Sequence, residues 1–173
     1  CYSGSVLIAK DGDVVFEKGF GKSNRKTNEK NTTTTIFRLA SLTKQLTAAA
    51  IMILQERSLI DINEPINTYL TDYPNGDVIT AKHLMNHTSG IPNYDKVPAI
   101  SNALDTDMTP IELVNHFKNL PLEFTPGTQY SYSNSGYTLL GYLIENVYGV
   151  TYERAIQQLI FDPLDMNDSE YGE

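Results

Sequence analysis

The feature that most constrains the fold is an almost unbroken apolar run inside the first predicted helix. Leu46 to Leu54 reads LTAAAIMIL, within a segment from about Ser41 to Arg57 that contains no glycine or proline. A helix that is apolar on every face is normally buried in the centre of a protein. The run is far shorter than the roughly 20 residues of a membrane helix, so it predicts a central core helix and no membrane span.

The composition is that of a globular protein with one core. The chain has 173 residues, of which 40% are hydrophobic and 20% charged, and a chain of this size buries enough surface for one domain. We expect a single domain over residues 1–173, made of a hairpin and loop (1–40), the central helix (41–58) and a mainly helical part (59–173). With 13 Lys+Arg against 21 Asp+Glu and no basic cluster, a nucleic-acid partner is excluded.

The N-terminal segment has the pattern of a β-hairpin. Two strand-like runs, Ser5–Ala9 and Val14–Phe16, flank Asp11-Gly12, a dipeptide typical of the tight turn between antiparallel strands. A polar stretch over residues 19–35 then predicts a loop. Because an isolated hairpin is marginally stable and its edges are open, we expect association through these edges with another chain or a complementary C-terminal fragment.

The rest of the chain predicts a mostly helical body with a long loop. The stretch from Thr88 to Asp107 has two prolines and no periodicity, and its length indicates the rim of a site rather than a simple connection. Capping residues, helical spacing of apolar residues and breakers define the helices. We expect helices from Thr80 to His87, from the Thr109–Glu112 capping box to about Lys118, over the apolar residues 139–147 up to Gly149, and from Thr151 to Asp162-Pro163.

Ser41 and Lys44 are the first candidates for chemistry. They stand three residues apart at the start of the central helix, where such positions share a face. A serine hydroxyl becomes a nucleophile when a neighbour removes its proton, and a lysine does so only when neutral. Neutralising a lysine at pH 7 costs roughly 4.6 kcal/mol, which a dry helix N-terminus helps to offset. The alternative is that Ser41 only caps the helix, although Lys44 then lies where the dipole disfavours a cation.

Tyr132 and Asn134 are the second pair of candidates. They are two residues apart in the turn-rich loop Phe124–Tyr137, so in an extended segment both side chains point to one side. A tyrosine near a lysine can relay protons as a phenolate, and an asparagine amide can hold a substrate carbonyl. The alternative is structural: Tyr132 packs under the following helix, and Asn134 caps it.

Taken together, these segments resemble consecutive motifs of the serine β-lactamase and penicillin-binding protein superfamily, in the branch of class C β-lactamases, DD-peptidases and related esterases. The resemblance runs from the hairpin to the end of the chain. It implies an α/β (α+β) fold with an antiparallel sheet and a helical subdomain. The motifs are Phe37-Arg-Leu-Ala-Ser-Leu-Thr-Lys44, His83-Leu-Met-Asn-His-Thr-Ser-Gly-Ile-Pro92, Pro126-Gly-Thr-Gln-Tyr-Ser-Tyr-Ser-Asn134 and Phe161-Asp-Pro-Leu-Asp-Met166.

The resemblance implies a role for each candidate. Ser41 resembles the acylated nucleophile, Lys44 its base partner, and Tyr132 the second proton-transfer residue. Asn134 resembles the amide that helps to hold Lys44 and the substrate. The implied activity is that of a serine hydrolase acting through an acyl-enzyme on D-Ala-D-Ala-type peptides of peptidoglycan or on β-lactams. The resemblance also implies a bacterial protein outside the cytoplasm, in the periplasm or at the cell surface.

The chain departs from the family pattern in its third motif. No K-T-G or H-T-G triad follows the tyrosine motif, and the nearest string, Lys26-Thr-Asn28, lies in the wrong segment. The remaining strands and terminal helices of the family also have no counterpart. We therefore expect the N-terminal and helical part of a hydrolase, poorly active by itself. The alternatives are a non-catalytic fragment or binding module of the same fold, and a carboxylesterase. Asp165 replaces a usual glycine, which affects only a turn.

The sequence does not favour a cofactor or a metal site. His83 and His87 are four apart, but no glutamate lies between them as in H-E-x-x-H, and the only other histidine is His116. We expect the first two histidines to have a packing role and no metal to be bound. The proposed hydrolysis uses no organic cofactor.

Overall fold

A computed structural model describes residues 2–97 and 108–171 of the chain. The chain divides into two compact units, residues 1–39 and residues 40–173, which are described separately below. The second half of the loop expected to form a site rim, residues 98–107, lies outside the described residues, as does Cys1.

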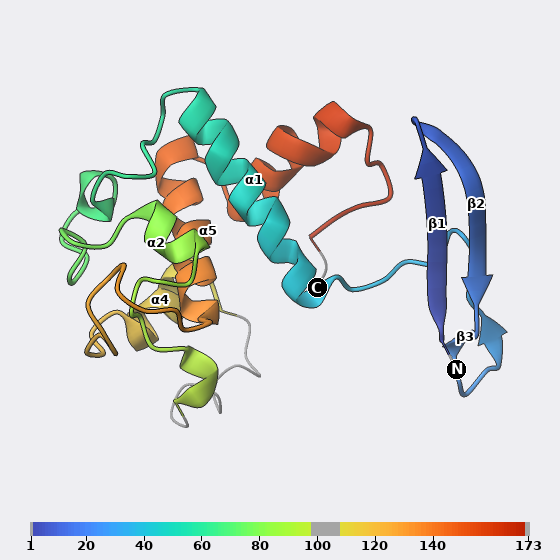
Figure 1. Ribbon diagram of the computed structural model, residues 1–173, viewed down its shortest axis with the longest axis horizontal. Helices are drawn as coiled ribbons and strands as arrows, with labels where there is room; N and C mark the ends of the chain where they lie inside the picture. The colour runs from blue at the N-terminus through green and yellow to red at the C-terminus, as the bar shows by residue number, and fades with distance from the viewer. Residues whose placement is uncertain (1, 98–107, 172–173) are drawn as a thin grey trace. The chain divides into compact units, whose positions relative to one another are not determined.

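The first unit contains the predicted β-hairpin (Figure 1). Strand β1 spans Gly4–Lys10 and pairs antiparallel with β2, Asp13–Phe20. Asp11 and Gly12 form the turn with φ angles of 56° and 92°, the left-handed conformation that an Asp-Gly turn adopts readily. The register shifts between Ile8 and Ala9, which indicates a β-bulge in the hairpin.

The expected loop after the hairpin contains two further short strands, so the prediction of a loop over residues 19–35 was incomplete. Strand β3, Lys22–Asn24, pairs antiparallel with β4, Glu29–Lys30. The Asn24 side chain accepts the backbone N–H groups of Lys26 and Thr27 and so stabilises the turn between them. Strands of two and three residues are too short to show an alternating pattern.

Apolar side chains on the hairpin remain exposed. Leu7, Ile8, Val14, Val15 and Phe16 each keep between 42% and 62% of their accessible surface. Neighbouring residues of a strand point to opposite faces, so both faces of the hairpin carry exposed apolar groups.

The second unit is helical. Its elements are η1 (Ala40–Leu42), α1 (Thr43–Glu56), η2 (Ile66–Thr68), α2 (Ala81–Met85), η3 (Tyr94–Lys96), α4 (Pro110–Phe117), α5 (Asn134–Tyr148), α6 (Tyr152–Ile156), the π-helical turn η4 (Gln157–Phe161) and η5 (Asp162–Leu164). Helix α5 contacts α1, α2, α4 and α6, so it is the centre of the packing. The predicted helices are all present, although the last one widens into the π-helical turn.

The core of the second unit lies between α5 and the helices around it. The fully buried large side chains include Phe117 on α4, Ile51 and Leu54 on α1, and Leu139, Leu140, Leu143 and Ile144 on α5. The expectation that α1 is buried on every face was wrong, because Met52 keeps 46% of its surface exposed. Helix α1 therefore packs through the face that carries Thr47, Ala50, Ile51 and Leu54.

The predicted helix caps are confirmed. Thr80, Thr109 and Thr151 each accept a backbone N–H of the first turn of the helix that follows. Gly149 ends α5 with a φ of 78°, a conformation that costs little only for glycine. Asp165 has a φ of 52° at the end of η5, which fits the turn expected there.

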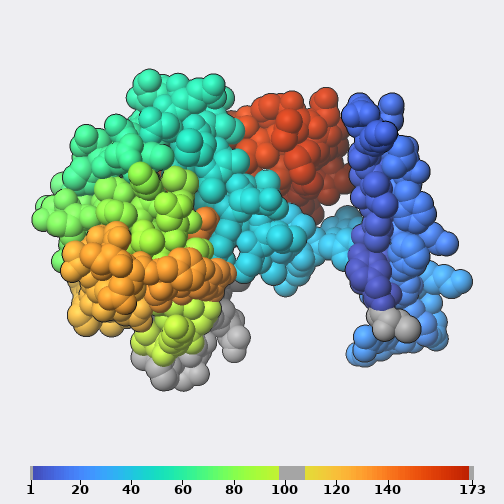
Figure 2. Space-filling view, in the orientation of Figure 1, coloured from blue at the N-terminus to red at the C-terminus, as the bar shows by residue number. Residues whose placement is uncertain are grey.

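Helix α1 is also tied to the C-terminal part of the unit. The Thr47 and Tyr152 hydroxyls share a hydrogen bond of 2.7 Å, and Figure 2 shows the C-terminal segment, in red, beside the surface of α1.

Among the residues that the structure describes, no helix combines the length and apolar character of a bilayer-spanning segment.

Candidate active site

The chain makes a tight turn immediately before Ser41. Ala40 has a φ of 48°, which is uncommon for a residue with a Cβ atom. Strained backbone conformations of this kind cluster at functional sites. Leu42 precedes α1, and no side chain caps the helix there. The alternative role of Ser41 as a helix cap was therefore wrong, and its hydroxyl is available for other contacts.

Three predicted site residues meet around the Ser41 hydroxyl. Its Oγ lies 3.0 Å from the Tyr132 Oη, and it accepts a hydrogen bond of 3.4 Å from the Lys44 Nζ. Ser41 lies in η1, Lys44 lies in the first turn of α1, and Tyr132 comes from the loop before α5. A hydroxyl in contact with both a phenol and an amine can lose its proton to them, which is the arrangement required of a serine nucleophile.

Two aromatic rings surround the Lys44 amine. Its Nζ lies 5.1 Å from the ring centre of Tyr132 and 5.5 Å from that of Tyr137. At such distances a cation is attracted to the face of an aromatic ring. These contacts restrict the half-buried Lys44 side chain to the neighbourhood of Ser41.

The phenol of Tyr132 is made more acidic by its neighbours. Hydrogen bonding from Lys44, then from Ser41, lowers the pKa of the Tyr132 phenol below its ordinary value of 10. Both contacts stabilise the phenolate more than the neutral phenol. The phenolate of Tyr132 is therefore easier to form, and in that state Tyr132 can accept a proton.

The site is open to water, which differs from the dry helix start that the sequence predicts. Ser41 is exposed, and Tyr132 keeps 38% of its surface. The low dielectric that strengthens charge interactions in closed active sites is therefore not provided by the described residues. The spacing of Ser41 and Lys44 predicts that their side chains lie close together, but it does not predict how exposed they are to water.

Asn134 is the fourth predicted residue, and it makes different contacts from those expected. Its side-chain amide donates a hydrogen bond of 2.5 Å to the Asp95 carboxylate, whereas the resemblance implies a contact with Lys44. Nor does Asn134 cap α5: Ser133 does so, its Oγ accepting the Gly136 N–H at 3.3 Å. Asp95 is thus a site neighbour that the sequence analysis missed, because no local pattern connects it to Asn134.

His83 of α2 and His87, which follows that helix, make different contacts. The His83 Nδ1 accepts the Thr80 N–H at 3.3 Å and completes the cap of α2. His87 lies beyond the helix and contacts Tyr132, with ring centres 4.6 Å apart. Within residues 2–97 and 108–171, no group of three or more His, Cys, Asp or Glu side chains is arranged to hold a metal.

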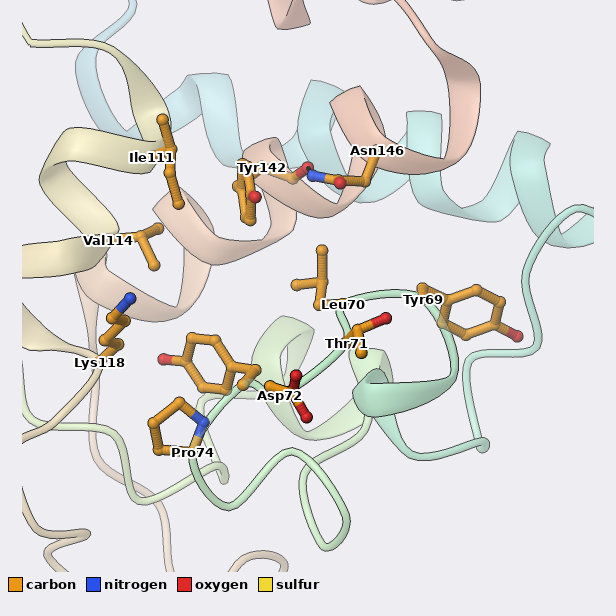
Figure 3. Close-up of a pocket in the computed structure, with 11 residues that line it drawn as sticks. Tyr69, Leu70, Thr71, Asp72, Pro74, Ile111, Val114, Lys118, Tyr142 and Asn146 are labelled. Carbon is orange, nitrogen blue, oxygen red and sulfur yellow. Dashed lines mark hydrogen bonds between the residues drawn. The ribbon is translucent and has the colours of Figure 1, made fainter.

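A separate pocket is formed by other parts of the second unit (Figure 3). The segment from Tyr69 to Pro74 faces Ile111, Val114 and Lys118 of the α4 region, and Tyr142 and Asn146 of α5. None of the four predicted site residues lines it. Tyr73 is buried there, which raises the pKa of its phenol.

Comparisons with known proteins identify the family and the fold of the chain. The sequence matches the Beta-lactamase family over residues 2–173. Penicillin-binding protein 4* of Bacillus subtilis (strain 168) is 34% identical over 176 residues, an alignment that covers 97% of this chain and 38% of that relative. The chain spans well under half the length of the curated relatives it matches.

Two solved structures show the same fold. A penicillin-binding protein from Bacillus halodurans has a TM-score of 0.85 and 32% identity, with 98% of this chain and 52% of that chain covered. The D-amino acid amidase from Ochrobactrum anthropi SV3, complexed with L-phenylalanine amide, has a TM-score of 0.79 and 28% identity, with 94% and 44% covered. The expected β-lactamase/transpeptidase-like fold is thus confirmed.

Proposed function

Because this chain belongs to the beta-lactamase family, whose penicillin-binding members are serine hydrolases, we propose that it carries the nucleophile and proton-transfer groups of such a hydrolase. The observation that supports this proposal is the contact of the Ser41 Oγ with both the Tyr132 Oη and the Lys44 Nζ. In this proposal Ser41 attacks a carbonyl carbon and forms an acyl-enzyme, which water then hydrolyses.

Tyr132 moves the proton in each half of the reaction, and Lys44 assists it. As the bond from the Ser41 oxygen to the carbonyl carbon forms, the hydroxyl proton passes to the Tyr132 phenolate and then to the leaving nitrogen. In deacylation the attacking water gives its proton to Tyr132, and the Ser41 oxygen takes it back as it leaves. Lys44 stabilises the phenolate, which is consistent with the lowered pKa of Tyr132.

The substrate class that we propose is a peptide or amide ending in a D-amino acid, such as the D-Ala-D-Ala stem of peptidoglycan, with β-lactams as mimics. Two similarities support it: one relative is a penicillin-binding protein, and a structural neighbour is a D-amino acid amidase. A role in peptidoglycan chemistry also places the reaction outside the bacterial cytoplasm.

The proposal includes a partner for the open site. The chain has no K-T-G or H-T-G motif after Tyr132, and the Ser41 side chain is exposed. An N–H donor to the developing oxyanion contributes about 3 kcal/mol to such reactions. We therefore expect full activity only when a further segment or a second polypeptide supplies that strand, and residues 1–173 alone to behave as a weakly acylated binding module.

Labelling with a fluorescent penicillin, followed by intact-mass analysis, tests the proposal. We expect a single covalent adduct that is absent from the Ser41→Ala variant and retained in Ser23→Ala, a matched change at an exposed serine in β3. The label is measured both on residues 1–173 and on the longest protein that contains them. Absence of label from both proteins would overturn the hydrolase proposal and favour the non-catalytic binding module.

Comparison of acyl donors tests the substrate class. Release of D-alanine from a D-Ala-D-Ala peptide is measured beside hydrolysis of p-nitrophenyl esters, with Ser41→Ala as the blank for both. Faster turnover of the peptide supports the proposal. Turnover of the esters alone would assign the protein to the carboxylesterase alternative.

A further inference from the structure

His87 holds the chain on both sides of Tyr132. Its carbonyl oxygen accepts the Ser131 N–H at 2.9 Å, and its Nδ1 accepts the Ser133 N–H at 3.2 Å. The two residues next to Tyr132 in sequence are therefore fixed to one residue that lies more than forty positions earlier in the chain. Such a double attachment restricts the backbone torsions that direct the Tyr132 side chain.

The imidazole of His87 also contacts the Tyr132 ring directly. The two ring centres are 4.6 Å apart, with an angle of 36° between the planes. On α5 the Tyr137 ring lies 5.1 Å from the imidazole, and its hydroxyl is fixed by donation to the Met85 carbonyl at 2.9 Å. Tyr132 is therefore packed against a ring whose own position is supported.

The backbone of His87 is adapted to this task. Its φ of 57° lies in the left-handed region, which turns the chain away from α2 directly after Asn86, the C-cap of that helix. Histidine is among the residues that adopt this conformation more often than most, and asparagine adopts it readily. The conformation places the carbonyl and the imidazole of one residue within reach of the same loop.

The protonation state of His87 decides whether one of these contacts exists. Nδ1 accepts the Ser133 N–H only when that nitrogen carries no proton, so the neutral ring holds its proton on Nε2. Protonation of the His87 Nδ1 would place its N–H against the Ser133 N–H, and neither group can accept a hydrogen bond from the other. Burial, then the charge of Lys44 beside the ring, lower the pKa of His87 below its ordinary value, against a smaller opposing effect of the Ser133 backbone.

We propose that neutral His87 is a positioning residue for Tyr132, holding the phenol against Ser41 and Lys44, and that protonation of the imidazole releases this hold. The inference rests on the proposed function for its catalytic consequence, but its structural part stands independently. It predicts that the hydrolase loses activity in acid through displacement of Tyr132, in addition to any titration of the phenol.

Several titratable groups surround His87. Lys44 acts on it from α1, Tyr130 and Tyr132 contact it from the loop before α5, and Tyr137 contacts it from α5. Asp95 acts on Tyr132 from η3 and raises the pKa of the phenol. Lys44 is the group whose charge disfavours an imidazolium, so its removal would allow His87 to protonate at higher pH.

Two variants of His87 separate the hydrogen bond from the ring. His87→Asn keeps a side-chain acceptor close to the position of Nδ1 and tolerates the left-handed backbone. His87→Ala removes both the acceptor and the ring. His83→Asn is the matched control. His83 is also half-buried, and its Nδ1 also accepts a backbone N–H, which belongs to Thr80 in the cap of α2.

The first measurement is NMR of the intact protein, which does not depend on catalysis. With ¹³Cζ-labelled tyrosine, the Tyr132 resonance is identified by its loss in Tyr132→Phe, and its titration reports the phenol pKa. We expect His87→Ala to raise that pKa toward the ordinary value, and His87→Asn and His83→Asn to leave it close to that of the unaltered protein. The ¹⁵N shifts of His87 are expected to show the proton on Nε2.

The second measurement is the rate of acylation by a fluorescent penicillin as a function of pH. His87→Ala is expected to lower the maximal rate by about tenfold or more with little change in the penicillin concentration that half-saturates it, because small misplacements of a catalytic group are costly. His87→Asn is expected to recover most of the rate and to shift the acid limb to lower pH.

The outcomes distinguish this inference from the proposed function. An unchanged Tyr132 titration in folded His87→Ala, or a proton on Nδ1 of the unaltered protein, would overturn it. If His87→Ala does not fold, a raised Tyr132 pKa in His87→Asn would overturn it equally. Failure of the penicillin to label any variant, with the NMR result as expected, would reject the hydrolase proposal and leave the positioning of Tyr132 by His87 established.

Discussion

Asn134 donates its side-chain amide to the Asp95 carboxylate at 2.5 Å, so the first residue of α5 is fixed to η3. The Asn134 backbone N–H also donates to the Asn93 Oδ1 at 3.1 Å. The described part of the loop expected to form the site rim is therefore attached to the start of α5, next to Tyr132 in the sequence. This attachment places a carboxylate where it acts on the phenol, since the charge of Asp95 raises the pKa of Tyr132.

Neutralising Asp95 is therefore expected to make Tyr132 more acidic. In Asp95→Asn the negative charge that opposes the phenolate is lost, while an amide oxygen remains to accept from Asn134. The pKa of the Tyr132 phenol should fall further below 10, as measured by the ¹³Cζ titration of that residue. Asp95→Glu keeps the charge and serves as the control, and a Tyr132 pKa that rises in Asp95→Asn would contradict this account.

Removing the Tyr132 hydroxyl is expected to slow acylation strongly. General acid and base groups contribute about 100-fold to 10,000-fold, so Tyr132→Phe should lower the rate of penicillin labelling within that range while Ser41 remains in place. Tyr171→Phe is the control, because Tyr171 is also an exposed tyrosine and contacts Tyr152 rather than the site. An unchanged labelling rate in Tyr132→Phe would show that Lys44 alone activates Ser41.

Local patterns were sufficient for the hairpin, for the main helices and for part of the site. Asp11-Gly12 forms the hairpin turn, and Thr109 with Glu112 forms the capping box of α4, because such contacts involve residues close in sequence. The same holds for Ser41 and Lys44, which meet because they stand three residues apart where η1 leads into α1. The contact with Tyr132 spans 91 residues, and it was expected only through the family resemblance.

Contacts that depend on packing were not predictable in this way. The alternation of burial along α1, with Met52 exposed, depends on which neighbours reach each face of the helix. The partner of Asn134 and the attachment of His87 to the chain around Tyr132 depend on how η3, α2 and α5 meet. The exposure of Ser41 likewise depends on what packs over the site.

The stability of the second unit is expected to decrease in mild acid. Burial lowers the pKa of both His83 and His87 in the folded chain, whereas in the unfolded chain both have ordinary values near 6.5. As the pH falls below about 6.5, the unfolded state therefore binds protons that the folded state does not. The free energy of unfolding should fall with the pH until the folded-state pKa values are passed.

Urea denaturation at a series of pH values between 7.5 and 5, about the range in which histidine titrates, measures this effect. The double variant His83→Asn and His87→Asn should show a weaker dependence on pH than the unaltered chain. His116→Asn is the control, since His116 belongs to α4 and has no part in these contacts. An equal pH dependence in the double variant would assign the acid sensitivity to carboxylates instead.

The hydrogen bond between Thr47 and Tyr152 is expected to couple α1 to α6. The Thr47 hydroxyl also reaches the Thr43 carbonyl at 3.3 Å, so Tyr152→Phe leaves it a partner and should destabilise by about 1 kcal/mol. Thr47→Val leaves a largely buried phenol unpaired and should cost more, about 1–3 kcal/mol. Urea denaturation of both single variants and the double variant gives the coupling, and purely additive effects would show that the bond contributes nothing.

The exposed hairpin is expected to make residues 1–173 associate. Open strand edges pair readily with other strands, and Val14 and Val15 add apolar surface, with 55% and 61% of each side chain exposed. Valine-to-threonine changes keep the β-branched shape that favours strands. Val14→Thr with Val15→Thr should therefore lower the average mass in sedimentation equilibrium, whereas Val78→Thr, at a valine with 50% exposure in the second unit, should not. If the hairpin variant associates as strongly as the unaltered chain, the apolar side chains of Val14 and Val15 do not drive the association.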